Sequence, residues 1–323
     1  MGIAKYIFYI LIFISFFLPY TVAAQNKSIK IFDWNDAYLY NFYSACPISS
    51  GDIWIVGSHG QIAHYDPELN QWIAQDPNLT ENLYQIEFAN PDRGWIVSTK
   101  GRILHTKNGG KTWELQETPV EEHLFSISCT DKKTAWAVGC FGTILHTDNG
   151  GKSWQRQGEK IDRIYNKVIF IDDQYGWIVG EYGVILHTQN GGKTWVEQDH
   201  DLGEVTLFSV CFKNRSQGWI TGMGGRMLET SDGGENWKEV RTPVDVHLFD
   251  VDCSTDKKHS VGFQGVYIKN DGNKWYELTD AIPARSWLRD VTFLNENKGW
   301  TVGSAGAVFY TQDGGQNWEK PKN

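Results

Sequence analysis

Four histidines at equivalent positions are the residues that most suggest metal chemistry. His64, His105, His146 and His187 follow one another at intervals of 41 residues. A zinc site holds its imidazole nitrogens about 2 Å from the ion, and therefore within about 4 Å of one another. The constant interval places each histidine in a separate repeating unit, which keeps the rings on the order of 10 Å apart. We therefore expect no metal and no cofactor, and interpret each histidine as half-buried and bonded within its own unit.

The five cysteines could do redox or metal chemistry only where they meet in space. Their number is odd, so at least one thiol should be unpaired, and none has the spacing of a metal motif. Four of them lie in the apolar run before a repeat's first tryptophan, where we expect separate, small, buried apolar residues: Cys46, Cys129, Cys211 and Cys253.

A repeat that fills the chain sets these intervals. The string GWIVSTKGRILHTKNGGKTW at 94–113 returns as GWIVGEYGVILHTQNGGKTW at 176–195. The first tryptophans of the copies are Trp54, Trp95, Trp136, Trp177, Trp219 and Trp300, and the closing ones are Trp72, Trp113, Trp154, Trp195, Trp237, Trp275 and Trp318. One further copy, at 259–275, has Ser260 in place of the first tryptophan. The chain therefore contains seven copies.

Each copy reads as four short strands, because runs rich in Ile, Val, Leu, Trp and Thr alternate with Gly, Asn and Asp clusters. Seven such units predict an all-β protein, a seven-bladed β-propeller with four antiparallel strands per blade. A solenoid would need atypical end copies, whereas the last copy here is regular. We expect one domain over 25–323, with residues 28–36 completing the last blade, and blades at about 37–76, 77–117, 118–158, 159–199, 200–241, 242–279 and 280–323.

The end of the repeat is a turn between the third and fourth strands. Its Asp or Asn accepts backbone N–H groups, its glycines take positive φ, and its tryptophan packs on a neighbouring strand. The pattern matches the Asp-box of bacterial neuraminidases, and its predicted structural residues are Asn108, Trp113, Asn149, Trp154, Asn190, Trp195, Asp232, Trp237, Asp313 and Trp318.

Sialidases carry Asp-boxes, so a glycoside hydrolase is one alternative function. The resemblance to sialidases would require an arginine in the first blade, but the first arginine of this chain is Arg93. General glycoside hydrolysis needs two carboxylates about 5–10 Å apart, which 39 acidic residues leave open. We expect no enzyme activity and no catalytic residue.

The complete repeat resembles that of the photosystem II stability/assembly factor family of cyanobacteria and chloroplasts, over all seven copies. The resemblance implies a propeller without enzymatic activity that docks on a membrane-protein subunit during assembly. The arginine patch of that family is reduced here to Arg102 and Arg226, which share a repeat position, and its lipid-anchoring cysteine is missing. A protein partner, such as a subunit of a membrane complex, is therefore expected, with a glycan-binding module as the other alternative.

The N-terminus has the features of a secretory signal peptide at residues 1–24, with one lysine, an apolar stretch and small residues ending at Ala24. We expect an exported protein, periplasmic or extracellular, without a membrane span after cleavage. The net charge of −9 argues against nucleic acid as a partner. We expect a monomer.

The loops that join strands 2 and 3, and those that join successive blades, share one face of a propeller. They vary in length and charge, whereas the Asp-boxes on the other face are repeated. We expect the partner to bind the variable face, through an arginine-rich and aromatic set of residues. These are Arg102, Arg163, Tyr182, Arg226, Arg285, Trp287 and Arg289.

Overall fold

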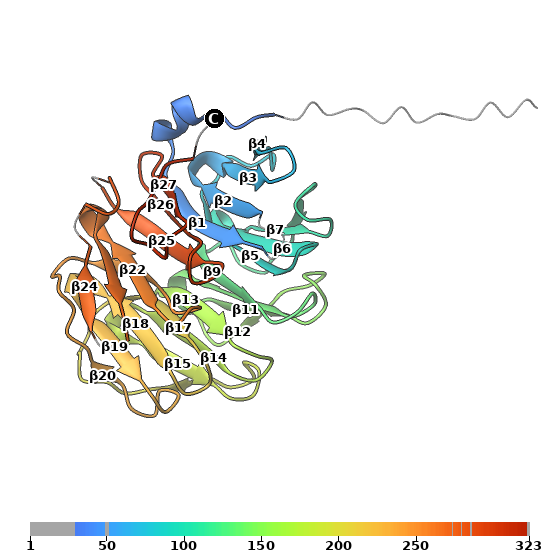
Figure 1. Cartoon of the computed structure of the whole chain (residues 1–323). Coiled ribbons are helices and arrows are strands. Elements are labelled where there is room, and N and C mark those ends of the chain that lie inside the picture. The colour runs from blue at the N-terminus through green and yellow to red at the C-terminus, as the bar shows by residue number, and fades with distance from the viewer. Residues whose placement is uncertain (1–29, 49–51, 273, 279, 285, 322–323) are drawn as a thin grey trace, which may run out of the picture.

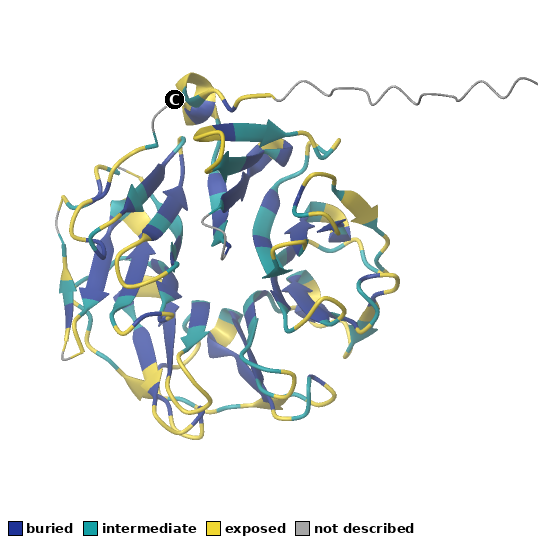
Figure 2. Ribbon diagram, turned by 45° about the vertical axis from the view of Figure 1, so that its right-hand side comes forward, coloured by how far each residue is buried: buried dark blue, intermediate teal, exposed yellow. Residues whose placement is uncertain are grey.

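The computed structural model describes residues 30–48, 52–272, 274–278, 280–284 and 286–321. The expected signal peptide at 1–24 and Arg285 lie outside these ranges. Within them the chain forms seven antiparallel sheets arranged in a ring, which confirms the seven-bladed β-propeller (Figure 1). Buried residues gather on the strands, and exposed residues gather in the turns and outer strands (Figure 2).

The first and second strands of each blade are five to eight residues long and carry most of the core. The first, innermost strands are β1 (Phe42–Pro47), β5 (Leu83–Asn90), β9 (Leu124–Cys129), β13 (Tyr165–Phe170), β17 (Leu207–Phe212), β21 (Leu248–Asp252) and β25 (Leu288–Phe293). The second strands are β2 (Ile53–Gly57), β6 (Arg93–Ser98), β10 (Ala135–Gly139), β14 (Gly176–Gly180), β18 (Gly218–Gly222), β22 (Lys258–Gly262) and β26 (Gly299–Gly303).

The third and fourth strands are shorter and increasingly exposed. The third strands are β3 (Ile62–Asp66), β7 (Ile103–Thr106), β11 (Ile144–Thr147), β15 (Ile185–Thr188), β19 (Met227–Thr230), β23 (Tyr267–Asn270) and β27 (Val308–Thr311). The fourth strands are β4 (Gln71–Gln75), β8 (Glu114–Gln116), β12 (Gln155–Gln157), β16 (Val196–Glu197), β20 (Lys238–Glu239) and β24 (Trp275–Glu277). In the described part of blade 7 a single bridge between Tyr310 and Glu319 stands at this position.

A short 3-10 turn joins strands 2 and 3 in six blades, and the corresponding turn of blade 7 has the same backbone. The turns are η2 (Ser58–Gly60), η3 (Thr99–Gly101), η4 (Cys140–Gly142), η5 (Glu181–Gly183), η6 (Met223–Gly225) and η7 (Phe263–Gly265). In η3 the middle residue Lys100 and the final Gly101 both have positive φ, 57° and 64°. A Cβ on Gly101 would lie 2.1 Å from the carbonyl oxygen of Val120, in the loop to the next blade. The glycine therefore lets the two loops of this face pack together.

The Asp-boxes form the turns that the sequence predicts. In blade 2 the Thr106 hydroxyl accepts the N–H of Gly110 at 2.8 Å and donates to Asn108 Oδ1 at 3.0 Å. Asn108 Oδ1 also accepts the N–H of Thr112 at 3.0 Å. The closing Trp113 lies edge-on to Trp54 of blade 1, with ring centroids 5.9 Å apart. These turns thus serve packing between neighbouring blades.

Each of the four repeated histidines stacks on the first tryptophan of its own blade, with centroids 4.2–4.8 Å apart. The prediction that all four are hydrogen-bonded within their blades is wrong for His105, whose two ring nitrogens have no hydrogen-bond partner among the described residues. Burial lowers its pKa to about 4, so the neutral ring is the folded form. Among the described residues no group of three or more His, Cys, Asp or Glu could hold a metal ion.

Blade 6 corrects the alignment of the sixth copy by one residue. His259, not Ser260, takes the place of the first tryptophan, because it pairs with Lys269 as Trp177 pairs with His187. It also stacks on Phe293 of the next blade with centroids 3.7 Å apart, as Trp177 stacks on Phe212.

The expectation that Cys211 and Cys253 are separate is wrong, because they form a disulfide with Cα atoms 6.0 Å apart. Cys211 is the fifth residue of its inner strand and Cys253 follows β21, so neighbouring inner strands bring the two together. Cys46, Cys129 and Cys140 are free.

Neighbouring inner strands are joined by one recurring hydrogen bond. A side-chain oxygen at the third or fifth position of one strand accepts a backbone N–H of the next, as Ser126 Oγ does from Val168 at 3.0 Å. The same contact closes the ring, because Asp290 Oδ2 of blade 7 accepts the N–H of Ala45 in blade 1 at 2.8 Å. At these seams the bonds satisfy backbone N–H groups of the inner edges that would otherwise be unpaired.

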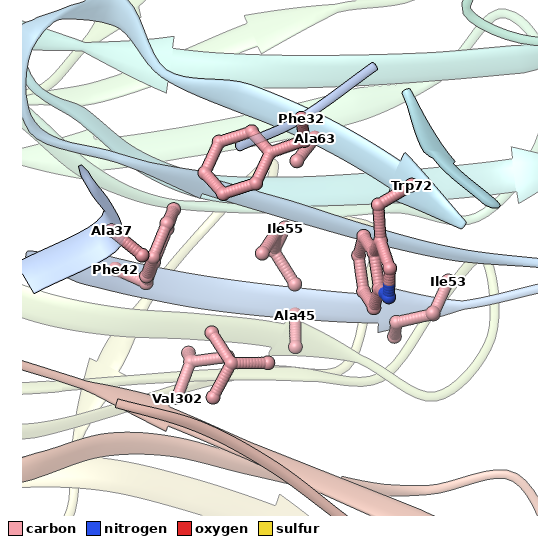
Figure 3. Close-up of a cluster of buried hydrophobic side chains, with 10 residues drawn as sticks. Phe32, Ala37, Phe42, Ala45, Ile53, Ile55, Ala63, Trp72 and Val302 are labelled. Carbon is pink, nitrogen blue, oxygen red and sulfur yellow. The ribbon is translucent and has the colours of Figure 1, made fainter. Parts of the chain in front are cut away.

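The N-terminal segment adds to blade 1, which corrects the expectation that 28–36 completes blade 7. Ala74 donates to the carbonyl of Lys30 at 2.7 Å, and Phe32 donates to that of Trp72 at 2.8 Å. Phe32 then packs into the cluster that contains Phe42 and Trp72 (Figure 3). This segment pairs with the outer edge of β4, which is longer than the other fourth strands. In blade 7 the position beside β27 that residues 28–36 were expected to fill is taken by the bridge at Glu319.

The 3-10 helix η1 (Trp34–Leu39) follows this segment and leads the chain onto blade 7. Gly306 donates to the carbonyl of Tyr40 at 2.8 Å, and Ala305 donates to Asn41 Oδ1 at 3.1 Å. No described helix is long and apolar enough to cross a membrane.

Candidate binding site at the channel mouth

A β-bulge near the start of every inner strand builds the site. In each blade the register of the inner strand shifts between its first and third residues. A bulge leaves one residue unpaired and re-aims its side chain. Because the inner strands surround the channel, seven second residues gather at one end of it. We call this set the collar: Tyr43, Tyr84, Phe125, Asn166, Phe208, Phe249 and Arg289.

The collar is mainly aromatic. Tyr43 and Tyr84 have ring centroids 5.3 Å apart, Tyr84 and Phe125 5.0 Å, and Phe208 and Phe249 5.2 Å. Its side chains surround a cavity of about 30 Å³. The channel therefore narrows at the collar to a mouth whose wall is formed by aromatic rings.

Arg289 is the only charged member of the collar. Its guanidinium lies over the ring of Phe249, 5.5 Å from the centroid, and makes no ion pair or hydrogen bond with the described part of the chain. Burial lowers its pKa, while Asp250 and Asp290 act in the opposite direction. An arginine keeps its charge at any ordinary pH, so this is a cation with free donors in an aromatic mouth.

Behind the collar the channel widens to a cavity of about 460 Å³ that contains buried carboxyl groups. Burial raises the pKa of Glu87 to about 7 and that of Asp252 to about 6. Burial and the neighbouring Asp250 raise the pKa of Asp290 to about 8. At neutral pH the Asp290 carboxyl is therefore mostly protonated.

These carboxyl groups are engaged in the structure of the ring. Glu87 Oε1 accepts the N–H of Cys129 at 3.0 Å, and Asp252 Oδ2 accepts that of Phe293 at 3.1 Å. Asp250 Oδ2 accepts that of Val291 at 3.0 Å. Each carboxyl group therefore makes the same kind of hydrogen bond to the next blade as the serine side chains make between blades 3 and 4. The sequence analysis did not predict this cluster of carboxyl groups.

The predicted arginine-rich set is on the expected face but is not one cluster. The 2–3 turns and the blade-to-blade loops do meet, since Thr118 Oγ1 donates to the carbonyl of Gly101 at 2.7 Å. Arg102 is paired with Glu81 at 3.2 Å, Arg163 with Glu197 at 3.4 Å, and Arg226 with Glu239. Tyr182 is exposed at the tip of its turn. These residues surround the ring without contacting Trp287 or Arg289.

Trp287 and Arg289 contact the blades on opposite sides of blade 7. Trp287 stacks in parallel on Tyr43 of blade 1, with centroids 6.0 Å apart and an angle of 6° between the rings, whereas Arg289 reaches Phe249 of blade 6. Sequence reasoning missed the aromatic members of the collar. Their signal was present, because an aromatic residue stands second in five of the seven inner strands: Tyr43, Tyr84, Phe125, Phe208 and Phe249.

The fold and the turns define the chain as a seven-bladed propeller with Asp-box repeats. A family model described as photosynthesis system II assembly factor YCF48 matches residues 63–160, 157–249 and 267–323. The chain therefore belongs to the YCF48 family of photosystem II assembly factors. A search of curated proteins finds no match.

Solved structures agree on the fold. A structure titled YCF48 bound to D1 peptide is 21% identical, over 74% of this chain and 80% of that chain, with a TM-score of 0.62. YCF48 from Cyanidioschyzon merolae is 20% identical, over 73% and 84%, with a TM-score of 0.58. Virginiamycin B lyase from Staphylococcus aureus is 14% identical, over 83% and 93%, with a TM-score of 0.72. Identities this low establish the architecture, which is shared by binding proteins and enzymes.

Proposed function

We propose that this chain is an exported, non-catalytic propeller that binds an extended segment of a membrane-protein subunit during assembly. The observation that carries the proposal is the unpaired guanidinium of Arg289 within the aromatic collar. Family membership supports a protein partner, and a related propeller has been solved with a D1 peptide. The segment that fits this mouth carries a carboxylate next to apolar or aromatic side chains.

Arg289 and Trp287 are the proposed centre of the interface, and the paired arginines form its rim. Arginine and tryptophan dominate interface energetics where they are desolvated, whereas exposed ion pairs contribute little. The rim residues Arg102, Arg163, Tyr182 and Arg226 are therefore expected to influence the rate of encounter more than the affinity.

The binding test uses the mature chain, residues 25–323, and fluorescent peptides in which one carboxylate is flanked by apolar residues. We expect Arg289→Ala to weaken capture by about tenfold or more, and Arg102→Ala to change it by less than about threefold. Equal capture by the wild type and by Arg289→Ala, with both proteins folded, would refute the assignment of the mouth.

The proposed absence of catalysis rests on the engagement of the channel carboxyl groups, which accept backbone N–H groups between blades. We expect no hydrolysis of aryl glycosides, sialosides or polysaccharides. Turnover that Glu87→Gln or Asp252→Asn abolishes in a folded protein would overturn this part of the proposal.

Export is proposed from the signal peptide at residues 1–24. Expression with the natural N-terminus, followed by fractionation and N-terminal sequencing, should give a periplasmic or secreted protein that begins at Gln25. Recovery of the full-length chain from the cytoplasm would contradict export.

A further inference from the structure

The seam between blades 7 and 1 differs from the seams that an Asp-box covers. In blades 2 and 4 the second glycine of the Asp-box lies over the first tryptophan of the preceding blade. A Cβ on Gly110 would be 2.2 Å from Trp54, and one on Gly192 would be 2.5 Å from Trp136. Blade 1 has no Asp-box. Its hairpin is instead closed by Asp66, whose carboxylate accepts the N–H groups of Glu68 and Leu69 at 2.9 and 3.0 Å.

At this seam Trp300 of blade 7 is less covered than the equivalent tryptophans. The first tryptophans of blades 1 to 5 are at most 5% exposed, whereas Trp300 is only partly buried. Beside it lies a cavity of about 450 Å³ between blades 7 and 1, with Tyr310, Tyr65, Trp72, Lys298 and Asn70 in its wall. This volume is in the range of small-molecule sites.

The cavity wall also contains an unsatisfied donor. In blades 3, 4 and 5 the closing tryptophan donates its indole N–H to a glutamine of the preceding blade, at 3.0, 3.2 and 3.2 Å. That glutamine stands three residues after the preceding blade's closing tryptophan. At the seam between blades 7 and 1 the equivalent residue is Pro321, which offers no side-chain acceptor.

Trp72 is only 6% exposed, and its indole N–H makes no hydrogen bond in the described part of the chain. Other closing tryptophans also lack a partner, but the nitrogens of Trp113, Trp275 and Trp318 are enclosed by protein, whereas Trp72 lines the cavity. Its nitrogen lies on the side of the ring nearer Ile53, which also lines the cavity (Figure 3). The donor therefore needs an acceptor that the protein does not supply.

We propose that this seam binds a saccharide unit of a glycan, and that Lys298 favours a sugar that carries a carboxylate. Sugars present C–H faces, which pack on aromatic rings, and oxygen atoms, which accept hydrogen bonds. The wall provides both, because it contains aromatic rings together with the Trp72 N–H and the Asn70 amide. The Asn70 oxygen already accepts from Tyr65 at 2.6 Å, which leaves its NH₂ group for a ligand. Lys298 is exposed and is the one charged residue in the wall.

The test is calorimetric titration of the mature chain with three ligands. Trigalacturonic acid is the sugar that carries carboxylates, and cellotriose is the neutral sugar. The amide of the peptide Gly-Phe-Gly represents the alternative ligand class, a peptide. We expect saturable binding of trigalacturonic acid. Trp300→Ala should weaken it by about tenfold and Lys298→Ala by about fivefold. Lys298→Ala should leave any binding of cellotriose unchanged, and Lys238→Ala, on an exposed outer strand, is the matched control.

No saccharide binding, or binding that neither Trp300→Ala nor Lys298→Ala weakens, would overturn the proposal. Binding of the phenylalanine peptide in place of both sugars, lost in Trp300→Ala, would overturn the choice of ligand class. Lys298 and Trp300 lie away from the mouth, so peptide capture measured on the same folded variants is expected to be normal. The two proposed sites can therefore fail independently.

Discussion

At the residue scale, Asp290 makes a hydrogen bond that closes the ring and should also make the stability of the protein depend on pH. It accepts the N–H of Ala45, which closes the ring, and its pKa is raised to about 8. A carboxyl group with a folded pKa above its unfolded value of about 3.9 binds more protons in the folded state between the two values. Its contribution to stability is therefore fully present below pH 4 and is lost as the pH rises through about 8.

Asp290→Asn keeps an acceptor for Ala45 and removes the ionisation. We expect the free energy of unfolding of the variant, relative to that of the wild type, to increase by about 1–3 kcal/mol from pH 5 to pH 8. Urea unfolding at both values measures the difference. Asp201→Asn, in an exposed loop, is the control and should show the wild-type dependence. A variant as pH-sensitive as the wild type would disprove the role of Asp290.

Gly110 permits close packing at a position that the sequence identified as part of an Asp-box. Its φ is 76°, and a Cβ would lie 2.2 Å from the Trp54 ring. We expect Gly110→Ala to lower the free energy of unfolding by about 3 kcal/mol or more, from backbone strain and overpacking together. Gly158→Ala meets the same strain, with φ 70° and nothing within 4 Å, and should cost only about 1 kcal/mol. Equal losses would show that the contact with Trp54 is unimportant.

Residue patterns predicted the Asp-box turns because their chemistry is local. Thr106, Asn108 and Gly110 bond within five residues of one another, so the sequence contains the whole motif. The first-tryptophan position of the sixth copy was predicted at Ser260, one residue after His259. The reason is that this copy lacks both the glycine and the tryptophan that fix the alignment of the other copies. The collar was missed because a bulge depends on strand pairing, which an apolar pattern does not reveal.

At the element scale, the N-terminal strand shows how far such reasoning extends. Pairing of this segment with an outer strand could be predicted from its composition, although residues 34–36 belong to η1. Its partner could not be predicted, because blades 1 and 7 both have outer edges. Pairing was decided by the longer β4 and by the fit of Phe32 beside Phe42 and Trp72.

This segment should therefore stabilise blade 1. Phe32 is 5% exposed, whereas its neighbour Ile31 is 55% exposed. We expect Phe32→Ala to reduce the free energy of unfolding by about 3 kcal/mol, and Ile31→Ala to change it by less than about 0.5 kcal/mol. Chemical denaturation followed by tryptophan fluorescence tests this, and a Phe32→Ala protein as stable as the wild type would show that the segment is not docked in solution.

At the scale of the whole molecule, the seven seams are equivalent in the sequence repeat but not in their packing. The blade 5–6 seam is covalently joined by Cys211 and Cys253. The blade 7–1 seam lacks an Asp-box cover, contains a cavity of about 450 Å³, and is held by Asp290 and the loops next to η1. The period predicted the number of blades, but it could not predict these differences, because they arise where copies depart from the repeat.

The ring should consequently open first between blades 7 and 1. Fewer packed atoms at a seam lower the free energy of local opening, which native-state hydrogen exchange measures. We expect the amide of Ala45, bonded to Asp290 at 2.8 Å, to exchange at least about tenfold faster than that of Val168, bonded to Ser126 at 3.0 Å in the blade 3–4 seam. Both amides are bonded to side-chain oxygens of a neighbouring inner strand, so the comparison isolates the packing of the seam. A saccharide that fills the cavity should slow the exchange of Ala45 and leave that of Val168 unchanged. If Ala45 is protected as well as Val168 in the free protein, the cavity does not weaken the ring, and opening must begin at another seam.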